Sequence, residues 1–215
     1  MFEFTKLLEI PPFSMNKAEK KDLYASAMQS LTNFHFNKCQ QYQKLLFNLG
    51  FDSERPCHIT GYPFLPVRLF KDYELLSVDR SEILKTMTSS GTSDQRVSKI
   101  FLDRATATNQ TKVLTKIVSN LIGAKRLPLL IIDTKAVVKD RKKFSARGAG
   151  ILGFSMFGID VTYALDENME LDIDAVQSFC EKHKNENLLL FGFTYIIWEY
   201  FFKKLRKAGR RLELQ

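Results

Sequence analysis

A continuous apolar run, Leu127-Pro-Leu-Leu-Ile-Ile-Asp133, limits the fold of this chain more than any other feature of its sequence. A strand that is apolar on both faces has to be covered on both faces, as in the parallel sheets of α/β proteins. The run is too short to cross a membrane, which takes roughly 18 or more apolar residues, and no run of that length occurs elsewhere. The sequence therefore predicts a buried strand with helices on either side.

Strand and helix patterns alternate along most of the remaining chain. The other predicted strands cover residues 98–103, 161–165 and 188–193, and the helices that follow them cover residues 106–122, 172–184 and 194–209. Thr194 is expected to cap the last of these helices. Repetition of strand and helix is the pattern of a mainly parallel sheet. The predicted fold class is therefore α/β, with flanking helices on the sheet.

The first part of the chain, residues 1–54, is predicted to be helical. Asn16 and Glu19 form a capping-box pattern, apolar residues recur at the helical period as far as Leu49, and Gly50 ends the helix. His35 and Cys39 are four residues apart, but two such residues without a third indicate packing, so no metal site is predicted. Residues 55–215 would then form the α/β domain.

Composition excludes several classes of protein. The chain has 215 residues, 45% of them hydrophobic, which is enough for a sizeable core. Its N-terminus lacks the layout of a secretion signal, and its three cysteines lie far apart, so a cytoplasmic protein with buried thiols is expected. The net charge of +8 comes largely from residues 139–143 and 203–211. Since no nucleic-acid-binding motif accompanies them, solvated basic faces are predicted and nucleic acid is not expected as a partner.

Hydroxyl side chains gather around a glycine in Thr88-Ser-Ser-Gly-Thr-Ser93. Glycine lets the backbone approach a ligand, and successive N–H groups in a turn form a concavity that binds anions. Such a loop binds phosphate in many enzymes, but the same composition also occurs in surface turns. The spacing is neither that of a P-loop nor that of the dinucleotide fingerprint.

This segment resembles the Thr/Ser/Gly-rich phosphate loop of the adenylate-forming superfamily. Flanking segments narrow the resemblance to the acyl-protein synthetases, the fatty-acid-activating component of the bacterial bioluminescence reductase complex and its relatives. The segments that carry this closer resemblance are residues 63–71, 98–104, 146–154 and 191–198. The resemblance implies that residues 55–215 are part of an adenylate-forming N-terminal domain.

The resemblance also implies an activity. Long-chain fatty acid and ATP, with Mg²⁺, would give an acyl-adenylate and pyrophosphate, and the acyl group would pass to the thiol of an acceptor protein or reductase subunit. The implied phosphate-binding residues are Thr88, Ser89, Ser90, Gly91, Thr92, Ser93 and Lys99. The implied wall for the acyl group and adenylate consists of Gly192, Phe193, Thr194 and Tyr195.

Two departures from the superfamily pattern keep alternatives open. Asp94 stands where the superfamily has glycine and Arg96 where it has proline. The superfamily's adenine-binding loop, acidic magnesium ligand and mobile lysine would follow this sequence, so the N-terminal portion of a longer ligase is expected. The alternatives are a non-catalytic domain that binds a nucleotide or a partner, and a ligase that uses coenzyme A.

Three further features of the α/β region allow two interpretations each. Residues 145–158 contain four glycines and suit either a wall for an acyl chain or a buried turn. Asp133, at the end of the central strand, suits a ligand-binding role or a cap. Arg147 suits an anion site or an ion pair.

Overall fold

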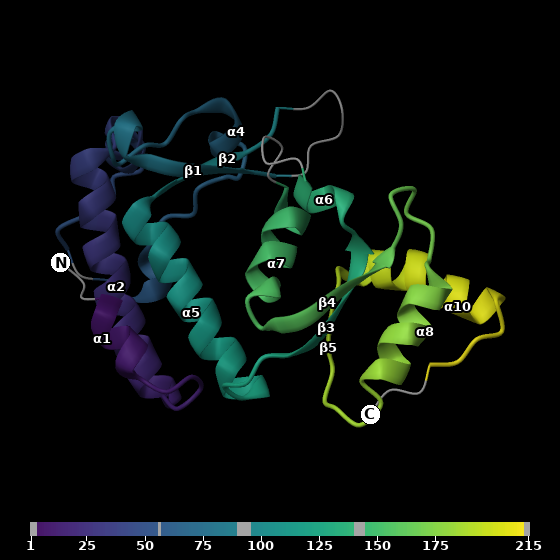
Figure 1. Ribbon diagram of the computed structural model, residues 1–215. Helices are drawn as coiled ribbons and strands as arrows, with labels where there is room; N and C mark the ends of the chain where they lie inside the picture. Colours follow the sequence, from purple (N-terminus) through teal and green to yellow (C-terminus); the bar gives the residue numbers. More distant parts are fainter. Residues whose placement is uncertain (1–3, 56, 90–95, 140–144, 213–215) are drawn as a thin grey trace. The chain divides into compact units, whose positions relative to one another are not determined.

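The computed structural model describes residues 4–55, 57–89, 96–139 and 145–212 (Figure 1). Contacts along the chain divide it into two compact units, Met1–Leu121 and Ile122–Gln215. Each unit has a sheet of its own, and no helix in the described ranges is long and apolar enough to cross a membrane.

The first unit is mainly helical. Its helices are α1 (Phe4–Glu9), α2 (Lys17–Lys38), α3 (Gln40–Asn48), the single turn α4 (Leu69–Asp72) and α5 (Arg104–Ile122), with short 3₁₀ turns at Ile59–Gly61 and Arg80–Glu82. The predicted capping box is confirmed, because Glu19 N donates to Asn16 Oδ1 at 3.0 Å and Asn16 N donates to Glu19 Oε2 at 2.8 Å.

The single helix predicted up to Leu49 is wrong. Cys39 has an extended backbone (φ −115°, ψ 102°) and separates α2 from α3. Cys39 and Leu46 are both buried, at 2% and 0% exposure, so the change of direction lets both side chains pack in the interior. Gly50 does end α3, with a φ of +64° that favours glycine.

The strand expected over residues 98–103 is β2 (Lys99–Asp103). It pairs antiparallel with β1 (Ile83–Thr88), a strand that the sequence pattern did not reveal, and Thr88 lies opposite Lys99. These two strands form a sheet of their own. The hydroxyl-rich segment therefore joins the two strands of a hairpin.

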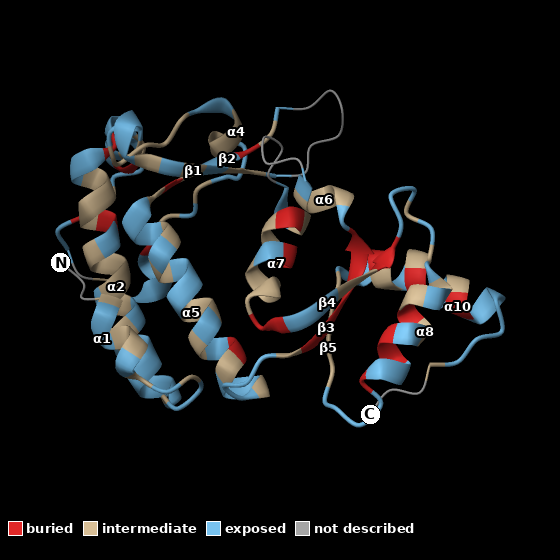
Figure 2. Cartoon of the chain, in the orientation of Figure 1, coloured by how far each residue is buried: buried red, intermediate tan, exposed pale blue. Residues whose placement is uncertain are grey.

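The second unit contains the parallel sheet that the apolar run predicted. Strand β3 (Leu127–Thr134) lies between β4 (Gly158–Leu165) and β5 (Leu189–Phe191) and is parallel to both. Leu129 to Ile132 are 0–2% exposed, and Figure 2 shows buried residues concentrated along this strand. The α/β fold class is confirmed.

Helices cover both faces of this sheet (Figure 1). On one face Leu130 and Ile132 pack in a cluster with side chains of α8 (Ile173–Lys182) and of the C-terminal helical segment. On the other face Leu129 and Ile131 pack with Ile151 of α7 (Ala146–Ser155). Successive side chains of β3 thus point to opposite faces, which explains why the run has to be apolar throughout.

Two local predictions for this unit are wrong. The buried turn considered for residues 145–158 is wrong, because most of them form α7, whose cap is Ser145, whereas the acyl-chain wall stays a prediction. The last helical segment comprises α9 (Thr194–Ile196), the π-helical turn η3 (Ile197–Phe202) and α10 (Lys203–Lys207). Its N-cap is Phe193, which makes no side-chain capping bond, and Thr194 is the first helical residue. A short helix, α6 (Ala136–Lys139), follows β3.

Candidate functional site

The hairpin of the first unit holds the two ends of the hydroxyl-rich loop together. Ser89 N donates to the carbonyl of Ser98 at 3.1 Å, and Ser98 N donates to Ser89 Oγ at 3.0 Å. Thr88 is the last residue of β1. Ser90, Gly91, Thr92 and Ser93, which the sequence predicted to bind phosphate, lie outside the described residues.

Ser98 is a candidate that sequence reasoning missed. It is 7% exposed, and its Oγ has no hydrogen-bond partner in the part of the chain that the structure describes. Buried hydroxyls are nearly always hydrogen-bonded, so an unpaired one at the base of a proposed phosphate loop is a candidate to bond a ligand oxygen. The sequence signal was indirect, since only pairing across the hairpin places Ser98 opposite Ser89.

The ammonium group of Lys99 is less available to a phosphate than the sequence suggested. Its Nζ lies 3.9 Å from Glu74 Oε1, and Glu74 also pairs with Arg80. The ammonium group therefore has an acidic neighbour already. Lys85 on β1 was not among the residues that the sequence predicted to bind phosphate, and burial lowers its pKa. The register pairs Lys85 with Leu102 and Lys99 with Thr88, so the two lysine side chains lie on opposite faces of the hairpin and a ligand anion on one face would meet only one of them.

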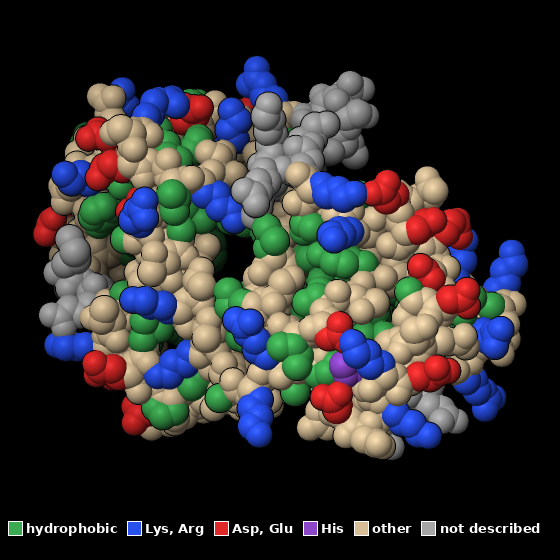
Figure 3. Space-filling model, viewed as in Figure 1, with side chains coloured by type: hydrophobic (Ala, Val, Ile, Leu, Met, Phe, Trp, Pro, Cys, Tyr) green, Lys and Arg blue, Asp and Glu red, His purple; other side chains and the backbone are tan. Residues whose placement is uncertain are grey.

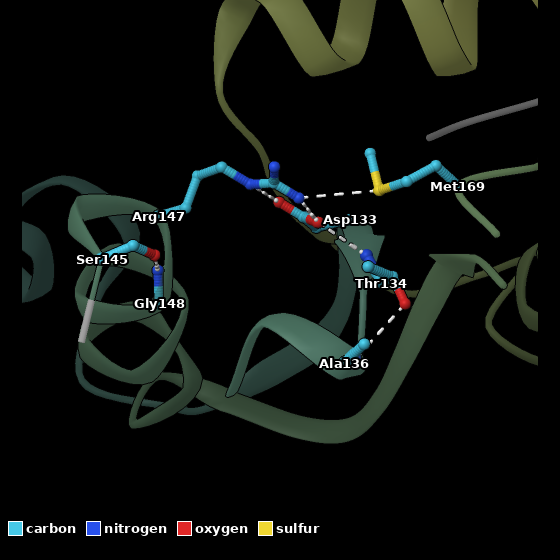
Figure 4. A network of polar contacts seen from close by, with 7 residues as sticks. All are labelled: Asp133, Thr134, Ala136, Ser145, Arg147, Gly148 and Met169. Atoms are coloured by element: carbon cyan, nitrogen blue, oxygen red, sulfur yellow. Dashed lines mark hydrogen bonds and ion pairs between the residues drawn. The ribbon is translucent and has the colours of Figure 1, made fainter. Parts of the chain in front are cut away.

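The second unit carries a buried ion pair at the C-terminal edge of its sheet (Figure 4). Asp133, near the end of β3, is 1% exposed. Arg147 of α7 donates to it twice, from Nε to Oδ2 at 2.9 Å and from Nη2 to Oδ1 at 2.5 Å. Thr134 N donates to the same Oδ1 at 2.7 Å. The ion-pair interpretation of Arg147 is thus confirmed, and Asp133 serves as its partner.

One nitrogen of the Arg147 guanidinium group, Nη1, takes no part in the two hydrogen bonds to Asp133. In Figure 4, Nη1 points away from Asp133, whereas Nη2 also lies 3.6 Å from Met169 Sδ. The cap of α7 is in use, because Ser145 Oγ accepts from Gly148 N at 3.1 Å. On β4, burial and the charge of Asp133 raise the pKa of Tyr163. The edge thus presents a fixed N–H donor group that an anion can use.

The predicted acyl wall begins at the same edge of the sheet. Phe191 of β5 is the register partner of Ile131 of β3. Gly192 and Phe193 therefore follow β5 at the level of Ile132 and Asp133. A Cβ at Gly192 would lie 2.9 Å from Ile197 Cγ1 and 3.0 Å from Ile132 Cβ, so core packing explains this glycine. Phe193 packs edge-on against Phe191, with ring centroids 6.3 Å apart. Thr194 and Tyr195 are exposed.

The sequence matches the model of the family described as "Acyl-protein synthetase, LuxE" over residues 4–214. The chain belongs to the LuxE family of acyl-protein synthetases. No curated protein matches it.

An acyl-protein synthetase is a ligase that handles an acyl group and a protein acceptor. Within the described residues, no three His, Cys, Asp or Glu side chains are placed to hold a metal ion. On the face shown in Figure 3, Lys and Arg side chains are mixed with Asp and Glu rather than gathered into one basic patch.

Proposed function

We propose that this LuxE-family protein activates a long-chain fatty acid with ATP and transfers the acyl group to the thiol of an acceptor protein. The observation that carries the proposal is the family match, which extends over residues 4–214. The finer steps rest on the resemblance of the loop at Thr88–Ser93 to the phosphate loop of adenylate-forming enzymes and on the chemistry of the described side chains.

The hairpin suits the phosphates of ATP. Ser89 and Ser98 would stand at the base of the loop, with the unpaired Oγ of Ser98 available to a phosphate oxygen. Bound ATP with Mg²⁺ would supply an electrophilic phosphorus and a pyrophosphate leaving group. The residues of the chain have to hold that anion in place, because positioning and fixed donors lower the barrier when two anions react.

The sheet edge of the second unit suits a carboxylate or an acyl-adenylate. Arg147 is held by Asp133 and keeps its Nη1 donors for a ligand, and Phe193 offers an apolar surface next to the strand ends. In open parallel sheets, ligands bind outside the carboxyl ends of the strands. In the proposed reaction a carboxylate oxygen bonds to the α-phosphorus, the bond to pyrophosphate breaks, and the acceptor thiol later displaces AMP.

Exchange of labelled pyrophosphate into ATP tests the proposal. With the protein as its native host makes it, exchange should depend on added fatty acid, and hydroxylamine should trap acyl hydroxamate. Transfer to a protein thiol rather than to coenzyme A would then separate the acyl-protein reaction from that of a coenzyme A ligase. Absence of fatty-acid-dependent exchange would contradict the proposal.

A non-catalytic domain is the second candidate, and Asp94 is the observation that favours it. A carboxylate in a phosphate loop repels a triphosphate unless a cation lies between them. ATP binding without any pyrophosphate exchange would support this alternative.

A further inference from the structure

A groove in the first unit has no role in the proposed adenylation. It has a volume of about 350 Å³ and lies among α2, α5 and the segment that follows α1. Ligand pockets commonly measure roughly 300–1,000 Å³, so the groove is large enough for a slender ligand. All of its lining residues belong to the first unit.

The walls of this groove are mainly apolar. Helix α2 contributes Leu23 and Tyr24, and α5 contributes Val113 and Ile117. The segment after α1 adds further apolar side chains, namely Ile10, Pro11, Pro12, Phe13 and Met15. Three wall residues remain well exposed, with Phe13 at 70%, Tyr24 at 52% and Ile117 at 37%. Exposed apolar surface grouped in this way marks a binding site more often than isolated exposed residues do.

The charges along the groove are of one sign. Its lining includes Lys20 and Lys116 but no carboxylate. Lys116 Nζ donates to the carbonyl of Leu8. The ammonium group of Lys20 has neither an ion pair nor a hydrogen bond with any residue in the described ranges. An apolar groove beside the unpaired ammonium group of Lys20 is complementary to an alkyl chain that ends in an anion.

We infer that this groove binds the alkyl chain of a long-chain carboxylate, with the carboxylate beside Lys20. The choice of a fatty acid over other anionic amphiphiles rests on the proposed function, whereas the groove and its charge do not. Binding here requires no ATP. A second copy of the chain fits less well as the occupant, because it would bring another net charge of +8 against an unpaired lysine.

Displacement of a fluorescent probe tests this inference on the 215-residue chain. The probe is 11-(dansylamino)undecanoate, and the competitors are dodecanoate and dodecyltrimethylammonium, which share a chain length but carry opposite charges. We expect saturable probe binding without ATP and displacement by dodecanoate at a concentration roughly tenfold lower than that of the cation, a difference of the size expected for one favourable charge contact.

Matched variants locate the site. Ile117→Glu places a carboxylate in the groove and should weaken probe binding roughly tenfold or more, because an ionised group would have to be covered by the chain. Leu121→Glu is the control, since Leu121 lies on the same helix, is 69% exposed and does not line the groove. Lys20→Gln should reduce the preference for the carboxylate over the cation, whereas Lys21→Gln, next to it and outside the groove, should not.

Three outcomes would overturn the inference. They are no probe binding, equal loss in Ile117→Glu and Leu121→Glu, and a dimer in sedimentation that Ile117→Glu dissociates while the probe fails to bind. Pyrophosphate exchange by the native protein remains a separate readout. Absence of probe binding would therefore contradict ligand binding in the groove but not the proposed adenylation. Absence of pyrophosphate exchange would contradict the adenylation but not ligand binding in the groove.

Discussion

Arg147 and Asp133 join the first turn of α7 to the C-terminal end of β3 through two hydrogen bonds, 2.9 Å from Nε to Oδ2 and 2.5 Å from Nη2 to Oδ1. The carboxylate is 1% exposed, whereas the arginine side chain is 33% exposed. The pair therefore anchors the helix on the sheet, and it also fixes the direction of the one guanidinium nitrogen that faces away. The ligand binding proposed for this edge would thus depend on the same two side chains as stability does.

Replacement of Arg147 by Met should destabilise the protein by about 3 kcal/mol, because removal of one partner leaves a buried charge uncompensated. Urea unfolding measures the loss. The double variant Asp133→Asn with Arg147→Met should recover much of it. Lys135→Met, at an exposed position after β3, is the control and should change the free energy of unfolding by less than about 0.5 kcal/mol. Equal losses in Arg147→Met and Lys135→Met would show that the pair does not anchor α7.

Ser98→Ala should separate stability from nucleotide binding. The Oγ of Ser98 is buried without a partner among the described residues, so its removal should leave stability unchanged or raise it by up to about 1 kcal/mol. If that hydroxyl serves a phosphate oxygen, the affinity for ATP should fall roughly tenfold, as for one lost hydrogen bond to a charged group. Thermal melts with and without ATP measure both effects. A stable variant that binds ATP as the wild type does would exclude Ser98 from the site.

His183 should make stability depend on pH. Its Nδ1 lies 2.7 Å from Glu186 Oε1 and its Nε2 lies 2.7 Å from Asp160 Oδ2. The bond to Glu186 raises the pKa of His183, burial offsets part of this, and the bond to Asp160 raises the pKa further. The stabilisation from the charged imidazole is complete below the ordinary histidine pKa of about 6.5 and is lost as the pH rises through the higher folded value.

Urea unfolding of the wild type and of His183→Gln, over the range from about pH 6 to about pH 9, measures this effect. The difference between the two proteins should shrink as the pH rises. The comparison is needed because burial lowers the pKa of His35, whose contribution runs in the opposite direction. A difference that stays constant with pH would refute the prediction.

Gly192→Ala should destabilise the second unit. The added Cβ would lie 2.9 Å from Ile197 Cγ1, 3.0 Å from Ile132 Cβ and 3.1 Å from the Ile132 carbonyl. Overpacking of this kind costs roughly 1–3 kcal/mol. Denaturant unfolding measures the cost, and a change below about 0.5 kcal/mol would mean that the turn after β5 has room for a side chain.

Much of the second unit could be predicted because its signals are local. The apolar run before Asp133 requires cover on both faces, and the helical periods on either side provide it. The capping box at Asn16 and the stop at Gly50 were predicted for the same reason, since each depends on neighbours within one turn of helix.

The candidate sites were predicted less completely. Residues 192–195 do follow a strand end, and their role as an acyl wall stays a prediction. Gly192 itself is explained by contact with Ile132 and Ile197, which no short pattern reveals. Ser98 was treated as part of a strand, and its buried hydroxyl became a candidate only when the hairpin placed it opposite Ser89.

The sequence by itself determined the strands β2 to β5 and the helices α5 and α8, because backbone geometry and the period of apolar residues act over a few neighbouring positions. The tertiary structure decided where α2 ends at Cys39, the antiparallel pairing of β2 with β1, and the ion pair between Asp133 and Arg147. These features depend on groups that are distant along the chain and share a low-dielectric interior, where a polar atom has to find a partner. Which partner it finds is a property of the folded chain.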